Sequence, residues 1–121
     1  MTALLKEGSG WRLGWDQDRT PFQALVGGDS WAIELTQKEF ETLGHLAKQL
    51  AATMATMASE LMPDERITLE QETQQLWMEA EGFHHSYSLR FILLTGRGAE
   101  GTWPAAVVPD LLNGLDSISV F

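Results

Sequence analysis

One stretch, residues 36–62, constrains the fold of this chain more than any other. It begins with a capping box, in which the Thr36 hydroxyl accepts from the amide of Glu39 and the Glu39 carboxylate accepts from the amide of Thr36. Pro63 ends the run, because the residue before a proline is disfavoured in helical conformation. The pattern predicts a helix from Thr36 to Met62. Its apolar residues recur at steps of three and four and share one face: Phe40, Leu43, Ala47, Leu50, Met54, Met57 and Leu61.

Three short alternating segments precede this helix and are bounded by turn residues at 16–21 and 27–29. Alternation of apolar and polar residues between turns is typical of half-buried antiparallel strands. The residues that share an apolar face are Trp11, Leu13 and Trp15 in the first, Phe22, Ala24 and Val26 in the second, and Trp31, Ile33 and Leu35 in the third.

Four more strand-like segments follow Pro63. Pairing residues 66–72 with residues 75–81, and closing the next hairpin with a four-residue loop at 82–85, keeps the apolar residues of three strands on one side. This register places Trp77 opposite Arg90. The other predicted cross-strand pairs are Ile67 with Ala80, Leu69 with Met78, Met78 with Leu89 and Leu76 with Phe91.

The chain is predicted to form an α+β fold. We expect antiparallel sheets of about seven strands, the long helix after the third strand, and a short C-terminal helix that Pro109 opens. Both halves read as strands followed by a helix, which suggests an internal repeat. We expect a single domain over residues 1–121, with a flexible N-terminus (1–9), a core (10–115) and a C-terminal tail (116–121).

Composition excludes several function classes. With no cysteine, the chain has no disulfide, no thiolate metal site and no thiol nucleophile. We find neither a signal peptide nor an apolar run long enough to cross a membrane, so we expect a cytoplasmic protein without a membrane partner. The net charge of -9 disfavours binding of nucleic acid, because no run of basic residues offsets it.

Two motifs resemble ligand sites and are given structural interpretations. Residues 96–101 match G-x-G-x-x-G, but Thr102-Trp103-Pro104 follows where a dinucleotide site requires a helix, so we expect a hairpin connection. His84 and His85 are adjacent and lack a third ligand at useful spacing, so we expect a solvated turn. No cofactor and no metal are predicted.

The polar face of the Glu-rich strands is the candidate partner-binding surface. A protein partner, a nucleic-acid base stacked on Trp77 beside Arg90, and acid/base catalysis by paired glutamates are three alternatives for this face. Exposed carboxylates more often only solubilise a sheet. The candidate residues are Glu70, Glu72, Trp77, Glu79, Glu81 and Arg90.

The Ala- and Met-rich second half of the helix is the candidate dimer interface. Small and adaptable side chains suit close helix contact, either with the chain's own sheet or with the helix of a second copy. The candidate residues are Leu50, Met54, Met57 and Leu61.

Three stretches carry a resemblance to a known family: Trp11-Arg12-Leu13-Gly14-Trp15, then residues 31–36 with the long helix, and the Glu-rich strands up to residues 90–96. Together they resemble a small cyanobacterial protein family of unknown function. The resemblance implies a fold similar to Whirly-type single-stranded-DNA-binding transcriptional regulators, with helices laid across curved sheets and helix-mediated or swapped dimers. Those regulators bind nucleic acid through basic and aromatic sheet surfaces, whereas glutamates dominate the polar face here.

These observations lead to one expectation for function and two alternatives. We expect a non-enzymatic, acidic, homodimeric module that interacts with or regulates an unidentified protein partner. The first alternative is a single-stranded nucleic-acid-binding transcriptional regulator. The second is an acid/base enzyme that uses the sheet glutamates, although no feature of the sequence indicates a pocket.

Overall fold

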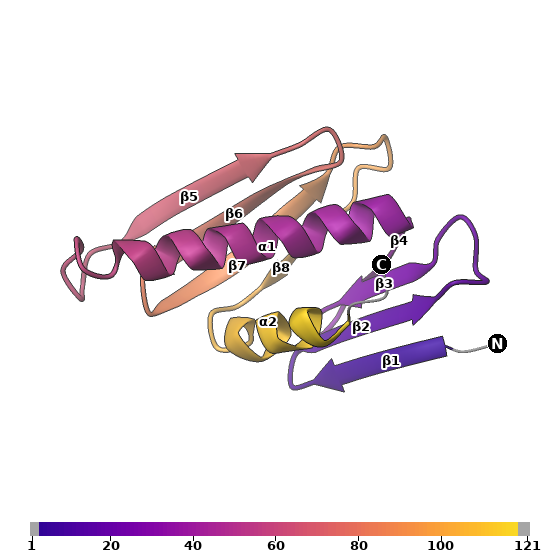
Figure 1. Ribbon diagram of the computed structural model, residues 1–121, viewed down its shortest axis with the longest axis horizontal. Helices are drawn as coiled ribbons and strands as arrows, with labels where there is room; N and C mark the ends of the chain where they lie inside the picture. Colours follow the sequence, from indigo (N-terminus) through magenta and orange to yellow (C-terminus); the bar gives the residue numbers. More distant parts are fainter. Residues whose placement is uncertain (1–2, 119–121) are drawn as a thin grey trace.

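Two four-stranded antiparallel sheets and two helices share one hydrophobic core in the computed structural model, which describes residues 3–118 (Figure 1). Sheet A has the strand order β1-β2-β3-β4, and sheet B has the order β5-β6-β7-β8. The elements are β1 (Ala3–Gly8), β2 (Trp11–Asp16), β3 (Ala24–Gly27), β4 (Ala32–Leu35), α1 (Gln37–Met57), β5 (Ile67–Glu72), β6 (Leu76–Phe83), β7 (Ser86–Leu93), β8 (Glu100–Trp103) and α2 (Val108–Ser117).

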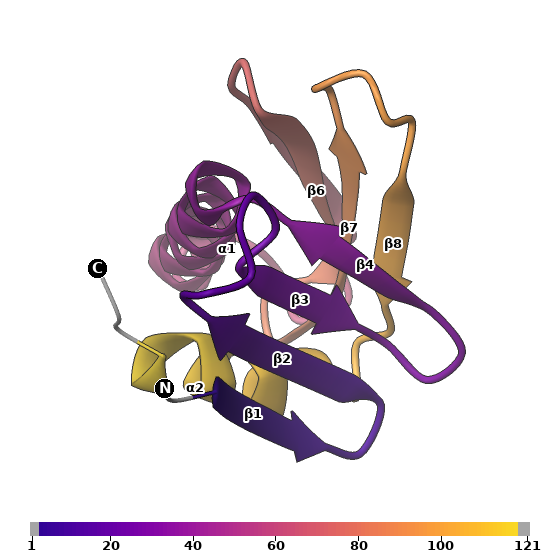
Figure 2. The same ribbon diagram turned by 90° about the vertical axis from the view of Figure 1, so that its right-hand side faces the viewer.

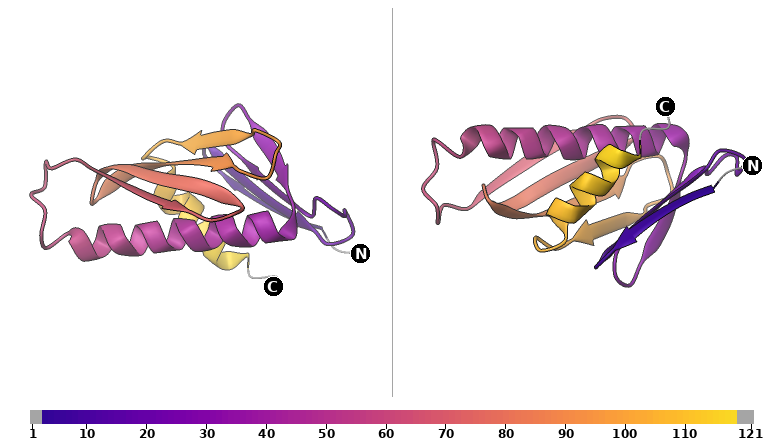
Figure 3. Two further views of the ribbon diagram at one scale, coloured as in Figure 1. Left: turned by 90° about the horizontal axis from the view of Figure 1, so that it is seen from above. Right: turned by 60° about the horizontal axis from the view of Figure 1, so that its bottom comes forward.

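Both halves of the chain have the same order of elements, four strands in a meander followed by a helix. Each helix packs mainly on the sheet of the other half. α1 lies across sheet B, against β5 and β6, while α2 packs against β1 and β2 of sheet A (Figures 1 and 3). The repeat suggested by the sequence is therefore present in the topology, and the exchange of helices joins the halves.

Tryptophan side chains join the two sheets at the centre of the molecule. The Trp103 indole N–H on β8 donates to the carbonyl of Gly27 on β3 over 2.9 Å, and both groups are buried. The Trp31 ring lies with its centroid 5.2 Å from that of Trp103. Gly101 allows this approach, because a β-carbon there would overlap the Trp31 ring. Figure 2 shows the two sheets meeting where β4 passes close to β8.

The predicted capping box is present at the start of α1. The amide of Glu39 donates to the Thr36 hydroxyl over 3.2 Å, and the amide of Thr36 donates to the Glu39 carboxylate over 2.8 Å. The helix ends at Met57 and not at Met62, because residues 58–60 are exposed and have no surface to pack on. Neither of the two described helices is long and apolar enough to cross a membrane.

The predicted number of strands was wrong. Residues 3–8, expected to lie in a flexible N-terminus, form strand β1 at the edge of sheet A, so residues 3–118 contain eight strands and α1 follows the fourth. An edge strand buries little of either face, and its pattern is correspondingly weak in the sequence. In the predicted tail, residues 116–117 belong to α2 and Ile118 is buried. Residues 119–121 lie outside the described part of the chain.

The predicted register in sheet B was wrong by two residues. Leu69 lies opposite Ala80 instead of Met78, and Met78 lies opposite Phe91 instead of Leu89. The first loop is longer than predicted and is held by the Thr73 hydroxyl, which accepts from two amides. The second loop is shorter, with two residues in place of four. A shift of two preserves the face of every side chain, so the predicted faces are correct.

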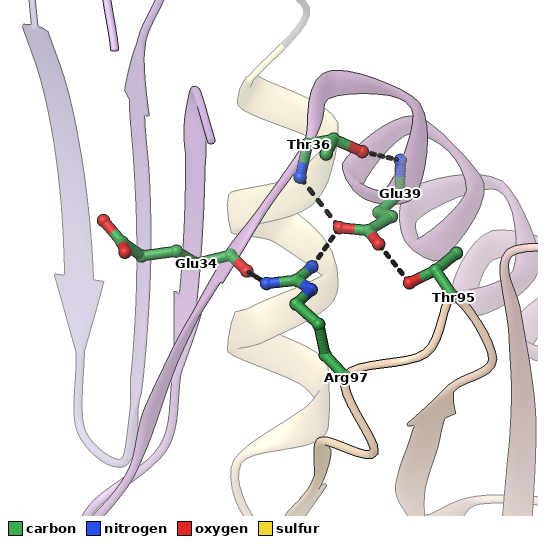
Figure 4. A network of polar contacts seen from close by, with 5 residues as sticks. All are labelled: Glu34, Thr36, Glu39, Thr95 and Arg97. Atoms are coloured by element: carbon green, nitrogen blue, oxygen red, sulfur yellow. Dashed lines mark hydrogen bonds and ion pairs between the residues drawn. The ribbon is translucent and has the colours of Figure 1, made fainter. Parts of the chain in front are cut away.

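A partly buried network of polar contacts fastens the glycine-rich β7–β8 loop to the start of α1 (Figure 4). The Glu39 carboxylate is 2% exposed and accepts from the Thr95 hydroxyl over 2.5 Å and from the Arg97 guanidinium. The same guanidinium donates to the backbone carbonyl of Glu34 over 2.6 Å and lies 4.6 Å from the centre of the Phe22 ring. Residues 96–101, which match the dinucleotide motif by letters, thus form a structural hairpin connection.

We predict that Arg97→Ala lowers the free energy of unfolding by about 2 kcal/mol, because it leaves the Glu39 carboxylate buried without its cation. The predicted loss in the free energy of unfolding is smaller than that for breaking a fully buried ion pair, because the Arg97 side chain is 32% exposed. Arg19→Ala is the control, because it removes an exposed ion pair with Glu34 and should cost at most about 1 kcal/mol. Urea unfolding of both variants checks this, and equal losses would contradict a structural role of the network.

Candidate functional site

The outer face of sheet B gathers all six sequence-predicted partner-binding residues. Side chains that alternate with the core residues of β5 to β8 point away from the helices. We call this surface the acidic face and define it by five glutamates together with Trp77 and Arg90. The five glutamates are Glu70, Glu72, Glu79, Glu81 and Glu100, of which the sequence analysis did not single out Glu100.

A row of charged residues crosses the middle of the acidic face. Glu70 on β5 lies directly opposite Glu79 on β6, and Glu79 lies opposite Arg90 on β7. Arg90 makes its ion pair with Glu100 on β8, over 3.1 Å. Two carboxylates therefore face each other across neighbouring strands, an arrangement that is unfavourable for the sheet itself.

Trp77 forms a flat, half-buried platform beside this row. Its indole N–H donates to the Glu70 carboxylate over 3.3 Å, and the Arg90 guanidinium lies 5.4 Å from the centre of its ring. The prediction that Trp77 lies opposite Arg90 was wrong, because Trp77 pairs with Ile92. The expected contact still forms, since a long arginine side chain reaches its diagonal neighbour.

The carboxylates of the acidic face differ in their partners. Glu81 pairs with Arg66, and Glu100 pairs with Arg90. Within residues 3–118, Glu72 and Glu79 make no hydrogen bond or ion pair through their carboxylates. The two arginines therefore leave a surplus of negative charge on this surface, to which Glu72 and Glu79 contribute.

The candidate dimer residues on α1 have different surroundings. Leu50 and Met54 are 1% and 0% exposed, because they pack in the chain's own core. Met57 and Leu61 are only partly exposed near the end of the helix. The first two therefore cannot contact a second copy without unfolding the core, and the homodimer itself stays a prediction.

A depression of about 240 Å³ lies between the two helices and the β6–β7 turn. Its walls are mostly apolar, and the imidazoles of His84 and His85 stand beside it with ring centroids 4.9 Å apart. No group of three potential metal ligands occurs among the described residues. The sequence did not indicate this depression, because its lining comes from segments far apart in the chain. The lining residues include Ala51, Ala55, Tyr87, Val108 and Leu112.

Tyr87 lines this depression, and its burial raises the pKa of its phenol above the usual value of about 10. The phenolate is better solvated in the unfolded chain. This group therefore contributes stability at neutral pH that is lost as the pH rises through about 10 and above.

We predict that phenolate absorbance titrates at a higher pH in the folded protein than in urea. Tyr87 is the only tyrosine, so the titration reports on this residue alone. Tyr87→Phe should lose less free energy of unfolding than the natural protein between pH of about 8 and about 11. Identical alkaline losses in the two proteins would contradict the role of Tyr87 burial.

Comparison with known proteins places the chain in a family. A crystal structure of a protein of unknown function from Prochlorococcus sp. NATL2A, described as a DUF155 family member, is similar with a TM-score of 0.90 and 36% sequence identity. The match covers 95% of this chain and 98% of that one. No match is found among curated proteins. Residues 6–118 match the domain of unknown function DUF1818, and the chain therefore belongs to the DUF1818 family.

Proposed function

We propose that this protein is a non-enzymatic, cytoplasmic interaction module whose acidic face binds a basic segment of a partner protein. The observation that carries the proposal is the charge of this face, where five glutamates outnumber Arg90 and the neighbouring Arg66, and both arginines already pair with glutamates. Surplus charge on one surface attracts an oppositely charged partner from a distance and orients it before contact.

Details of the face support a basic peptide as the ligand. Glu72 and Glu79 have no partner within the described residues, so their carboxylates can accept from lysine or arginine without breaking a contact. Trp77 lies beside them and is held in place by Glu70 and Arg90. Its ring offers an apolar surface for the aliphatic part of a basic side chain.

The two alternative functions have less support. Acid/base catalysis requires a concave pocket that excludes water around paired carboxylates, whereas the acidic face is an open sheet surface. Single-stranded nucleic-acid binding, as the resemblance to Whirly-type regulators implies, is favoured by the stacked Trp77 and Arg90 alone. The surrounding glutamates oppose it by repelling phosphates. A homodimer remains part of the proposal.

We expect a fluorescently labelled lysine- and arginine-rich peptide to bind in an anisotropy assay, with an affinity that falls as salt is raised. The variant Glu72→Gln, Glu79→Gln should bind about fivefold more weakly at low salt, because two unpaired charges are removed. The control Glu41→Gln, Glu60→Gln makes the same change in net charge away from the acidic face, and its affinity should stay close to that of the natural protein.

Two outcomes would overturn the proposal. Equal weakening by both double variants would mean that only the net charge of the molecule matters. Tighter binding of labelled single-stranded DNA than of the basic peptide, lost in Trp77→Ala, would favour the nucleic-acid function instead.

A further inference from the structure

We infer that two copies of this chain associate through strand β1, in antiparallel pairing about a two-fold axis at Leu5. The inference rests on the proposed homodimer and names its interface. β1 is hydrogen-bonded to β2 on one side only. At its other side no described segment covers the strand (Figures 1 and 2). An open edge presents unpaired backbone donors and acceptors to any strand that matches it.

An apolar row on the outer face of sheet A begins at this edge. Leu5 on β1 lies opposite Gly14 on β2, which lies opposite Leu25 on β3. Leu5 is 62% exposed and forms the end of this row at the sheet edge. A depression of about 190 Å³ lies beside it, and the absent side chain of Gly14 contributes to its depth. This row gives the edge an apolar surface that a second copy can cover.

The other sheet edges are poorer candidates for self-association. β4 and β8 have only four residues each. β5 is as long as β1, but its outer face carries Glu70 and Glu72, so pairing with itself would bring glutamates together. β1 carries one lysine and one glutamate, and its net charge is zero.

The sequence of β1 selects one register for the pairing. A two-fold axis normal to the sheet puts the outer faces of both copies on the same side of the joined sheet. Directly opposed residues must then share a face, so the axis lies between one residue of β1 and the same residue of the second copy. At Lys6 it would place two lysines opposite each other, and at Leu4 it would pair only residues 3–5. At Leu5 it pairs residues 3–7, with Leu5 against Leu5 of the second copy, Lys6 against a leucine and Glu7 against an alanine. No like charges meet in this register.

The pairing would join the two copies of sheet A into one eight-stranded sheet. The apolar row would then run without interruption from Leu25 through Gly14 and Leu5 into the same residues of the second copy. Each Leu5 would be covered by its symmetry mate. The interface uses no residue of the acidic face. A failure of the protein to dimerise would therefore leave the proposed peptide binding untouched, and a failure to bind the peptide would leave the dimer untouched.

Sedimentation equilibrium of charge variants tests the axis at Leu5. We expect the natural protein to dimerise. Leu5→Glu and Leu5→Lys should each lower the association constant at least about tenfold, because like charges would meet at the axis. An equimolar mixture of the two variants should regain dimers, because glutamate then faces lysine. Leu94→Glu is the control, since it changes another exposed leucine, and it should dimerise like the natural protein.

Crosslinking gives a second measurement that does not depend on affinity. The chain has no cysteine, so Leu5→Cys adds the only thiol. Directly opposed residues of antiparallel strands have Cα atoms about 4.5–5.5 Å apart, which suits a disulfide. We expect oxidation to crosslink Leu5→Cys into covalent dimers and to leave Leu94→Cys mostly monomeric.

Three results would overturn the inference. The first is a natural protein that remains monomeric at high concentration while Leu5→Cys fails to crosslink. The second is a Leu5→Glu variant that dimerises as strongly as the natural protein. The third is a loss of dimers in Met57→Glu, Leu61→Glu but not in Leu5→Glu, which would place the interface on the end of α1. Circular dichroism of each variant establishes that the fold is retained, as expected for exposed or partly exposed positions.

Discussion

The structure depends on burying the apolar faces of two separate sheets in one core. A four-stranded sheet with one apolar face must be covered by another element, and here each helix covers mainly the sheet of the other half. If the two halves were separated, the sheet of each half would therefore lose the helix that covers its apolar face. The hydrogen bond from Trp103 to Gly27 adds a direct link between the sheets at a buried point. Because each helix packs on the sheet of the other half, the two similar halves of the chain fold as one unit.

The buried Glu39 carboxylate joins the start of α1 to the β7–β8 loop. It serves the capping box and also receives the Arg97 guanidinium from a loop far along the chain. Because a buried charge is costly unless it is paired and hydrogen-bonded, the loop is held at the start of α1. One side chain thereby couples a local helix signal to the packing of sheet B on α1. The most buried carboxylate of the described residues therefore has a structural role.

The outer faces of the two sheets have different chemistry, although their topology is the same. Sheet B presents glutamates, which favour a basic partner and discourage pairing of its β5 edge with another copy. Sheet A presents an apolar row that reaches an open edge at Leu5. The two surfaces therefore support the two proposed contacts, one with a different protein and one with a second copy of the chain. The proposed contacts do not exclude each other, because the surfaces share no residue.

The sequence by itself determined most of the elements and the faces of their residues, because capping and the periods of two and 3.6 residues are local. It missed the edge strand β1 and placed the end of α1 too far along the chain. Thr36 and Glu39 identified the start of α1, and alternation placed Glu70, Trp77 and Glu79 on one polar face. Tertiary structure decided the cross-strand register, the partner of Glu39 and the burial of Leu50 and Met54. Register depends on loop lengths that pattern alone does not set, and the pairing of Glu39 with Arg97 joins residues far apart in the chain. An apolar helix face looks the same in sequence whether it packs on its own sheet or on another copy, and only the fold distinguishes the two.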